Sequence, residues 1–190
     1  MRRYAQDTEV PVERSRAEIE RLLKAHGASQ FGSASDEEKG IAFVMFKLQD
    51  RMFRIEVVSP TVAQFKRADP PPPPEPHKNG RHPYSREQLD QRDRTEYERV
   101  LKRHDANENA RAQRWLDGEE RRRWRAQLLL LKAKLEMVAM GATTVEREFM
   151  ADMLMANGQT VAQHALPQIE AMYRDGKMPK GGILMLGSGR

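Results

Sequence analysis

Residues 118–141 read GEERRRWRAQLLLLKAKLEMVAMG, and they combine the densest apolar run of the chain with its densest basic run. On a helix that turns about 100° per residue, apolar residues spaced 4-3-4-3 fall on one narrow stripe, which is typical of a buried face. This stretch contains such a stripe, made of Trp124, Leu128, Leu131, Leu135 and Val138. We therefore expect a central helix that packs into the core.

A second apolar side projects from the same helix. Its members are Leu129, Leu130, Ala133, Met137 and Met140. A helix that is apolar on two sides normally lies between two layers. We expect a sheet to cover one side and the helices after Gly141 to cover the other.

The start of this helix has two alternatives. If the helix continues through Asp117 and Gly118, four basic residues lie within about 40° of one another and form a basic stripe. These are Arg114, Arg121, Arg125 and Lys132. Alternatively, Asp117 and Glu120 form a variant of the capping box, so that the helix begins there and Arg114 and Trp115 belong to a preceding element.

The first half of the chain predicts a helix followed by three strands. Ser15 and Glu18 have capping-box spacing and Gly27 a C-terminal position, which predicts a helix over 16–26. The strands are GASQFGSAS, residues 27–35, then IAFVMFKL, residues 41–48, and RMFRIEVV, residues 51–58. Gln49 and Asp50 are short enough for a hairpin turn. This order predicts an antiparallel meander covered by helices on its apolar face.

Residues 60–114 interrupt the core. Prolines 70–74 and 76 predict a polyproline II spacer rather than a folded segment. His77 and His82, in the loop that follows, have no metal-site neighbours. Residues 85–114 are almost wholly polar, with both charges at helical spacing, which predicts a mobile, partly helical excursion or an arm that becomes ordered on a partner.

Two short helices and a tail end the chain. Thr143 with Glu146, and Thr160 with Gln163, have capping-box spacing, and Gly176 ends the second helix.

The predicted class is α+β: a three-stranded antiparallel meander packed by an N-terminal helix and a long central helix, with two short C-terminal helices. One core combines residues 1–68 with 111–176, residues 69–110 are the spacer and excursion, and 177–190 are a flexible tail with an apolar ILML.

Composition narrows the function classes. The net charge is +5, and residues 111–141 hold 8 Lys and Arg against 4 Asp and Glu, so most of the excess lies on the central helix. A basic cluster favours phosphates or an acidic protein surface, and a solvated basic face is the alternative.

The chain has no cysteine, which excludes disulfides and thiolate sites. No signal peptide or membrane-length apolar run is found, so we expect a soluble intracellular protein.

Motifs for catalysis are absent from the sequence. No Walker loop, GxGxxG, HExxH, GxSxG or EF-hand loop occurs. Glu148 and Asp152 lie four apart, a spacing more typical of a solvated helix face than of an acid and base pair. We therefore expect no enzyme, no cofactor and no metal.

Three segments resemble a family of uncharacterised proteins encoded by bacteriophages and prophages. They read VERSRAEIERLLKAHGASQFG, RRRWRAQLLLLKAKLEMVAMGATTVEREFMADMLMANGQTV and LPQIEAMYRDGKMP. The likeness omits residues 60–110 and supplies no site residues. The order of a helix, a meander and a long basic helix is also similar to the core of phage single-strand annealing proteins, a likeness at the level of fold.

The first hypothesis is therefore a phage protein that binds nucleic acid, favouring single-stranded DNA, in recombination or replication. Arginines would contact phosphates and tryptophans would stack on bases, although Trp124 fits the core better. The candidate residues are Arg111, Arg114, Trp115, Arg121, Arg122, Arg123, Arg125 and Lys132. The alternatives are an interaction or inhibitor module that acts on a host defence or transcription complex, and a self-assembling structural component.

Overall fold

The computed structural model describes residues 4–5, 8–36, 40–75 and 86–176. The chain divides into two units, one formed by Met1–Ser59 with Glu120–Arg190 and the other by Pro60–Glu119. The predicted tail at 177–190 and the histidine loop at 76–85 lie outside the described residues. The first unit, here called the core unit, contains the sheet.

Helix α1, Val12–Ala25, opens the core unit. Its N-cap is Pro11, and Ser15 is fully buried inside the helix, where its hydroxyl donates to the carbonyl oxygen of Pro11. The predicted capping box at Ser15 is therefore wrong. The predicted end is confirmed, since Gly27 has a φ of +90° and its N–H donates to the carbonyl of Lys24, a geometry that favours glycine.

The meander has the predicted strands. β1 is Gln30–Asp36, β2 is Ile41–Leu48 and β3 is Arg51–Val58, in the antiparallel order β1-β2-β3. Gln49 and Asp50 both have positive φ, 49° and 61°, which matches a two-residue hairpin turn whose twist suits the strands. The boundaries of β2 and β3 are those that the apolar run and the alternation predict.

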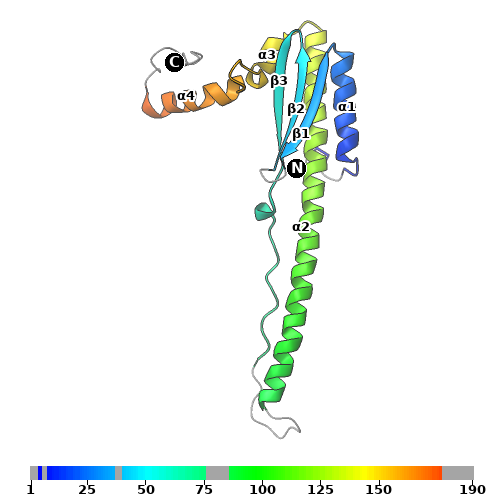
Figure 1. Ribbon diagram of the computed structural model, residues 1–190, viewed down its shortest axis with the longest axis vertical. Coiled ribbons are helices and arrows are strands. Elements are labelled where there is room, and N and C mark those ends of the chain that lie inside the picture. Colours follow the sequence, from blue (N-terminus) through cyan, green and yellow to red (C-terminus); the bar gives the residue numbers. More distant parts are fainter. Residues whose placement is uncertain (1–3, 6–7, 37–39, 76–85, 177–190) are drawn as a thin grey trace. The chain divides into compact units, whose positions relative to one another are not determined.

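One face of the sheet forms the core. The register sets Val44 opposite Ile55 and Phe46 opposite Phe53, so their side chains share a face. The two phenylalanine rings stack with centroids 5.2 Å apart. Buried side chains from α1, from the central helix and from the short helix α3, Val145–Phe149, complete this cluster. In Figure 1 both α1 and the central helix run beside the sheet.

The central helix α2, Arg86–Ala139, is continuous through Gly118. Helix geometry therefore extends through 86–114, which corrects the expectation of a partly helical excursion and removes the alternative of a start at Asp117. The side chain of Asp117 instead accepts a hydrogen bond from Gln113 at 2.9 Å. Gly141, with a φ of +71°, follows the helix and donates to the carbonyl of Val138.

Three short elements complete the core unit. α3, Val145–Phe149, is capped by Thr144, whose hydroxyl accepts from the N–H of Arg147, so the cap predicted at Thr143 is wrong by one residue. The 3-10 helix η2, Met150–Asp152, follows it directly. α4, Val161–Asp175, begins with the predicted capping box of Thr160 and Gln163 and ends at Gly176.

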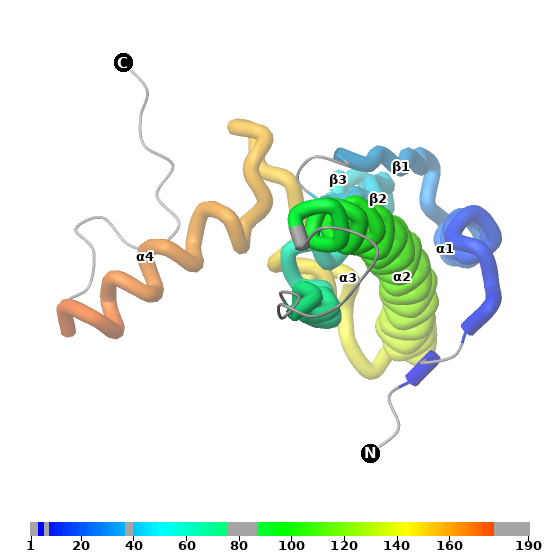
Figure 2. The backbone as a smooth tube through the Cα atoms, turned by 90° about the horizontal axis from the view of Figure 1, so that it is seen from below, coloured from blue at the N-terminus to red at the C-terminus, as the bar shows by residue number. Residues whose placement is uncertain are grey.

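The second unit pairs an extended segment with the first part of α2, and it contains the 3-10 helix η1, Val62–Gln64. The hydroxyl of Tyr97 donates to the carbonyl of Pro71 at 2.9 Å, and the N–H of Ala68 donates to Glu108 at 2.8 Å. The proline segment is therefore packed on a helix and is not only a spacer. Figure 2 views the chain along the axis of α2.

Candidate interaction surface on the central helix

The core unit buries one face of α2, here called the buried face. Trp124 and Leu131 have no exposed surface and Leu135 has 1 %. Leu128 and Val138 are partly buried and pack against the same cluster. The predicted 4-3-4-3 stripe is thus confirmed as the side that faces the sheet.

The other apolar side of α2 is open. Leu129, Leu130, Met137 and Met140 expose 46, 50, 44 and 70 % of their surface, and Ala133 is also exposed. The expectation that the C-terminal helices cover this side is wrong. Instead, α3 packs into the core cluster beside the sheet, and the first turn of α4 is bonded to β3.

Helix α3 packs on the aromatic side chains of the sheet. Val145 is 2 % exposed and Phe149 is fully buried. The ring of Phe149 lies 5.8 Å from that of Phe46 and 5.6 Å from that of Phe53, centroid to centroid. Because these two residues fill the space beside the sheet, α3 leaves the open side of α2 uncovered.

Helix α4 is attached to strand β3 by its first turn. The side chain of Gln163 accepts from Arg54 at 2.6 Å and donates to Glu56 at 2.7 Å. Immediately before α4, the N–H of Leu154 donates to the carbonyl of Met52, which continues the chain along the edge of β3. These bonds hold the start of α4 at the sheet edge.

The open side of α2 has a regular spacing of its own. Its exposed residues follow a 4-3-4-3 pattern, the same heptad spacing with which paired helices meet in coiled coils. We call this set the exposed seam: Ala126, Leu130, Ala133, Met137 and Met140. The sequence predicts a shared side for four of these residues together with Leu129, and the structure adds Ala126 and shows that nothing in the described part of the core unit covers this side.

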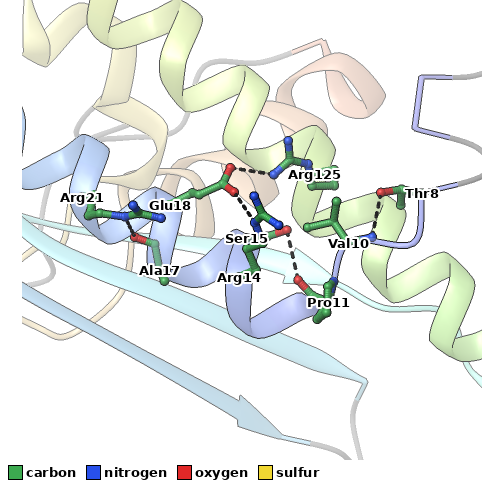
Figure 3. A network of polar contacts seen from close by, with 9 residues as sticks. All are labelled: Thr8, Val10, Pro11, Arg14, Ser15, Ala17, Glu18, Arg21 and Arg125. Atoms are coloured by element: carbon green, nitrogen blue, oxygen red, sulfur yellow. Dashed lines mark hydrogen bonds and ion pairs between the residues drawn. The ribbon is translucent and has the colours of Figure 1, made fainter.

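Two of the predicted nucleic-acid contacts form hydrogen bonds within the core unit. A guanidinium N–H of Arg123 donates to the carbonyl of Val58 at the end of β3. Arg125 donates to Glu18 of α1 at 2.7 Å, as Figure 3 shows. Glu18 also accepts from Arg14 at 3.2 Å, and the hydrogen bond from Arg125 is the main cause that holds the pKa of Glu18 below its ordinary value.

The remaining candidates in the core unit differ in accessibility. Arg121 and Arg122 are partly buried, whereas Lys132 is exposed and forms no ion pair with any described residue. Trp124 is fully buried, and the guanidinium of Arg16 lies 4.5 Å from its ring centroid. Trp124 is therefore a core residue and offers no face on which a base could stack.

Three predicted contacts belong to the second unit. Arg111 forms an ion pair with the buried Glu108 and lies 5.9 Å over the ring of Phe65. Trp115 packs on the same ring, with centroids 5.8 Å apart. The Nε of Arg114 donates to the carbonyl of Ala110 in its own helix. Hydrogen bonds from the N–H of Ala68 and from Arg111 hold the pKa of Glu108 below its ordinary value.

A basic residue between the two faces of α2 connects it to α3. The ammonium of Lys134 donates to the carbonyl of Glu148 at 2.6 Å and lies 4.9 Å from the ring centroid of Phe149. Nearby, burial raises the pKa of Asp152, and the charge of Lys134 partly opposes this effect. Sequence reasoning missed Lys134, because its contacts depend on where α3 folds.

Among the described residues, no three or more His, Asp or Glu side chains are grouped so that they could hold a metal ion. In the same part of the chain, no helix is long and apolar enough to cross a membrane.

The fold and this surface define an α+β protein with a three-stranded antiparallel sheet and an apolar helix side open to solvent. Comparisons of the chain with protein-family models, with curated proteins and with solved structures find no match.

Proposed function

We propose that this protein is a protein-interaction module, and that its binding surface is the exposed seam of α2. The observation that supports the proposal is the exposure of four large apolar side chains in one stretch of a single helix. Leu130, Met137 and Met140 of the seam, and Leu129 beside it, each leave between 44 and 70 % of their surface in water. Isolated exposed apolar residues are normal on proteins, but a contiguous set of this kind marks an interaction site.

The composition of the exposed seam agrees with this role. Methionine is enriched and charged residues are depleted at the centres of protein interfaces. All five positions of the seam are Ala, Leu or Met. Complete burial of a Leu or Met side chain contributes about 1.5–3 kcal/mol, so covering sites that are already half buried gives roughly half of that per residue. A partner helix with matching spacing would gain this energy over two heptads.

The test compares two variants of equal charge. Leu130→Asp places a carboxylate in the seam, and Lys132→Asp places one on the exposed surface outside it. Each variant is first checked by circular dichroism for an unchanged helix content. The partner is supplied either in nuclease-treated host lysate or as a component in solution. We expect the wild type and Lys132→Asp to retain the same protein partner at a fixed stoichiometry. We expect Leu130→Asp to lose it. Equal retention by all three proteins would contradict the proposal.

Nucleic-acid binding is a second candidate, in the phage recombination or replication setting that the sequence resemblance implies. It is favoured by basic side chains that are not neutralised. Arg114, Arg121 and Lys132 form no ion pair with any described residue. Each cation that contacts a phosphate of a single strand would add about 0.7 to the slope of log affinity against log salt concentration.

The structure changes the variant that tests this second candidate. Replacing Arg123 or Arg125 would remove bonds to β3 and α1, so loss of binding by such variants would not be informative. Arg114→Ala with Lys132→Ala leaves those bonds in place. Gel-shift titration with single-stranded and double-stranded DNA and RNA at two salt concentrations should show salt-dependent binding that this double variant weakens. Binding that is absent, or independent of salt, would exclude the candidate.

A further inference from the structure

The exposed seam has a counterpart on α4. The outward side of that helix carries apolar residues at a 4-3-4 spacing: Ala162, Leu166, Ile169 and Tyr173. Leu166 is 52 % exposed and Tyr173 is 89 % exposed. Ala162 and Ile169 are partly buried. A 4-3-4 spacing is the one that a second heptad seam can accept.

The two seams also have matching lengths. α4 has 15 residues, and the exposed seam spans residues 126–140 of α2. At about 1.5 Å of rise per residue, the apolar side of α4 over 162–173 is about 17 Å long and the exposed seam is about 21 Å long. The apolar side of α4 can therefore lie along the first four positions of the seam, residues 126–137.

An antiparallel arrangement matches the sizes of the side chains. If Leu130 lies opposite Ile169, then Ala133 lies opposite Leu166, and the a and d positions of the two heptads alternate as antiparallel pairing requires. The outer layers of this register are Ala126 with Tyr173 and Met137 with Ala162. Three of the four layers thus combine a small side chain with a large one, the alternation that fills a helix interface without voids.

Charge favours the same direction. In this register the C-terminal end of α4, where Asp175 is paired with Arg174 at 2.9 Å, lies level with the arginine-rich turn at 121–125. The N-terminal end of α4 lies level with residues 137–139, close to the exposed Glu136. Because a helix carries partial negative charge at its C-terminus and partial positive charge at its N-terminus, both ends meet the opposite sign. Parallel pairing would bring Asp175 toward Glu136 instead.

We propose that two copies of the chain pair reciprocally, with α4 of each copy lying antiparallel on the exposed seam of the other. This inference rests on the proposed function, since it names the partner of the same surface. In one copy, the first turn of α4 is bonded to β3 through Gln163 while Leu166, Tyr173 and the seam of α2 all stay exposed. Reciprocal pairing covers positions 126–137 of the seam and the apolar side of α4 in both copies, and it closes the assembly as a two-fold dimer.

The absence of cysteine from the chain makes disulfide trapping specific. Ala133→Cys and Leu166→Cys are prepared as separate full-length proteins, mixed, and oxidised. We expect a covalent heterodimer of twice the chain mass. The matched control mixes Ala133→Cys with Tyr173→Cys, which lies seven residues away from the facing position, and should give at least several-fold less product. A mixture of Ala133→Cys with Ile169→Cys reports parallel pairing.

Two results would overturn the inference. One result uses a single chain that carries both Ala133→Cys and Leu166→Cys and is oxidised at high dilution. A disulfide within that chain would mean that α4 folds onto its own α2. The other is a monomeric wild type in sedimentation at tens of micromolar together with no trapped heterodimer. Neither result removes the proposed function, because the comparison of Leu130→Asp with Lys132→Asp tests the seam for any protein partner.

Sedimentation also tests the energetic weight of the two seams. Leu130→Asp and Leu166→Asp lie on different helices, yet each should weaken the dimer at least tenfold. Lys132→Asp should leave its dissociation constant within about twofold. An effect of Leu130→Asp without any effect of Leu166→Asp would mean that a surface other than α4 covers the seam, and would contradict the inference.

Discussion

The second half of α2 carries two apolar faces with the same heptad spacing, and one of them is buried in the core unit whereas the other is exposed to solvent. The buried face, with Trp124, Leu131 and Leu135, is almost completely covered by the sheet and α1. The residues of the exposed seam alternate with those of the buried face along the same stretch of helix but lie on its other side, and Met140 among them is 70 % exposed. Spacing therefore decides which residues share a side of a helix, but the neighbouring elements decide which side is covered.

The largest expected effect separates two adjacent leucines. Leu131→Ala should lower the free energy of unfolding by about 2–5 kcal/mol, because it leaves a cavity in a packed core. Leu130→Ala should change it by no more than about 0.5 kcal/mol, because that side chain is half exposed in one copy. Urea unfolding at sub-micromolar protein concentration measures both without a contribution from dimer formation. Equal losses in the two variants would mean that both faces are covered within one chain.

Two lysines provide a similar contrast with a smaller effect. Lys134→Ala removes a hydrogen bond to the carbonyl of Glu148 and a contact with the ring of Phe149, so we expect a loss of about 1–2 kcal/mol. Lys132→Ala removes a side chain exposed to solvent and should be neutral within about 0.5 kcal/mol. The measurement is thermal and urea unfolding of both variants at pH 7. A neutral Lys134→Ala would show that α3 is not held against α2 in this way.

The ion pair of Glu18 and Arg125 tests how α1 is held beside the buried face. The folded pKa of Glu18 is lowered, so its contribution is present above the unfolded pKa of about 4.3 and is lost as the pH falls through the folded pKa. Glu18→Gln should cost about 0.5–1 kcal/mol at pH 7 and almost nothing at pH 2. Unfolding free energies across this pH range should therefore converge for the two proteins. A difference that persists at low pH would point to packing rather than charge.

Asp152 should show the opposite sign and the smallest effect. Burial raises its folded pKa above the ordinary value, so its contribution favours folding below the unfolded pKa and is lost as the pH rises through the folded pKa. Asp152→Asn should leave stability unchanged near pH 3 and raise it by a few tenths of a kcal/mol at pH 7, where the charged form is disfavoured by burial. Because Lys134 partly offsets this penalty, the gain should be larger in a Lys134→Met background. Destabilisation at pH 7 would indicate that the charge of Lys134 outweighs burial.

Much of the fold was accessible from the sequence because its signals are local. The alternation of Phe53, Ile55 and Val57 defines β3, and the capping box of Thr160 and Gln163 defines the start of α4. The predicted capping residues were wrong at two helix starts. Ser15 has the spacing of a cap, but Pro11 starts the helix and the serine is buried, and Thr144 rather than Thr143 caps α3.

The partners of the candidate site residues could not be predicted from the sequence, because these partners lie on distant segments. The sequence grouped Arg123 and Arg125 as phosphate contacts, but their partners, Val58 and Glu18, lie 65 and 107 positions away. The same limit applies to Lys134, because its contacts with Glu148 and Phe149 depend on where α3 packs. Charge along a helix can be read from the residues, but whether that charge is free depends on the whole core unit.

By itself, the sequence determined an α+β protein with three antiparallel strands, a central helix with two apolar faces, and no cysteine chemistry. These features follow from periodicity, capping and composition, all of which act over a few residues. Only the tertiary structure decided that the sheet covers one face of α2, that the C-terminal helices leave the other face open, and that several arginines form internal bonds. The physical reason is that burial and ion pairing are set by contacts between segments that are remote in the chain. The hydrophobic pattern of one helix does not specify which other elements pack against it.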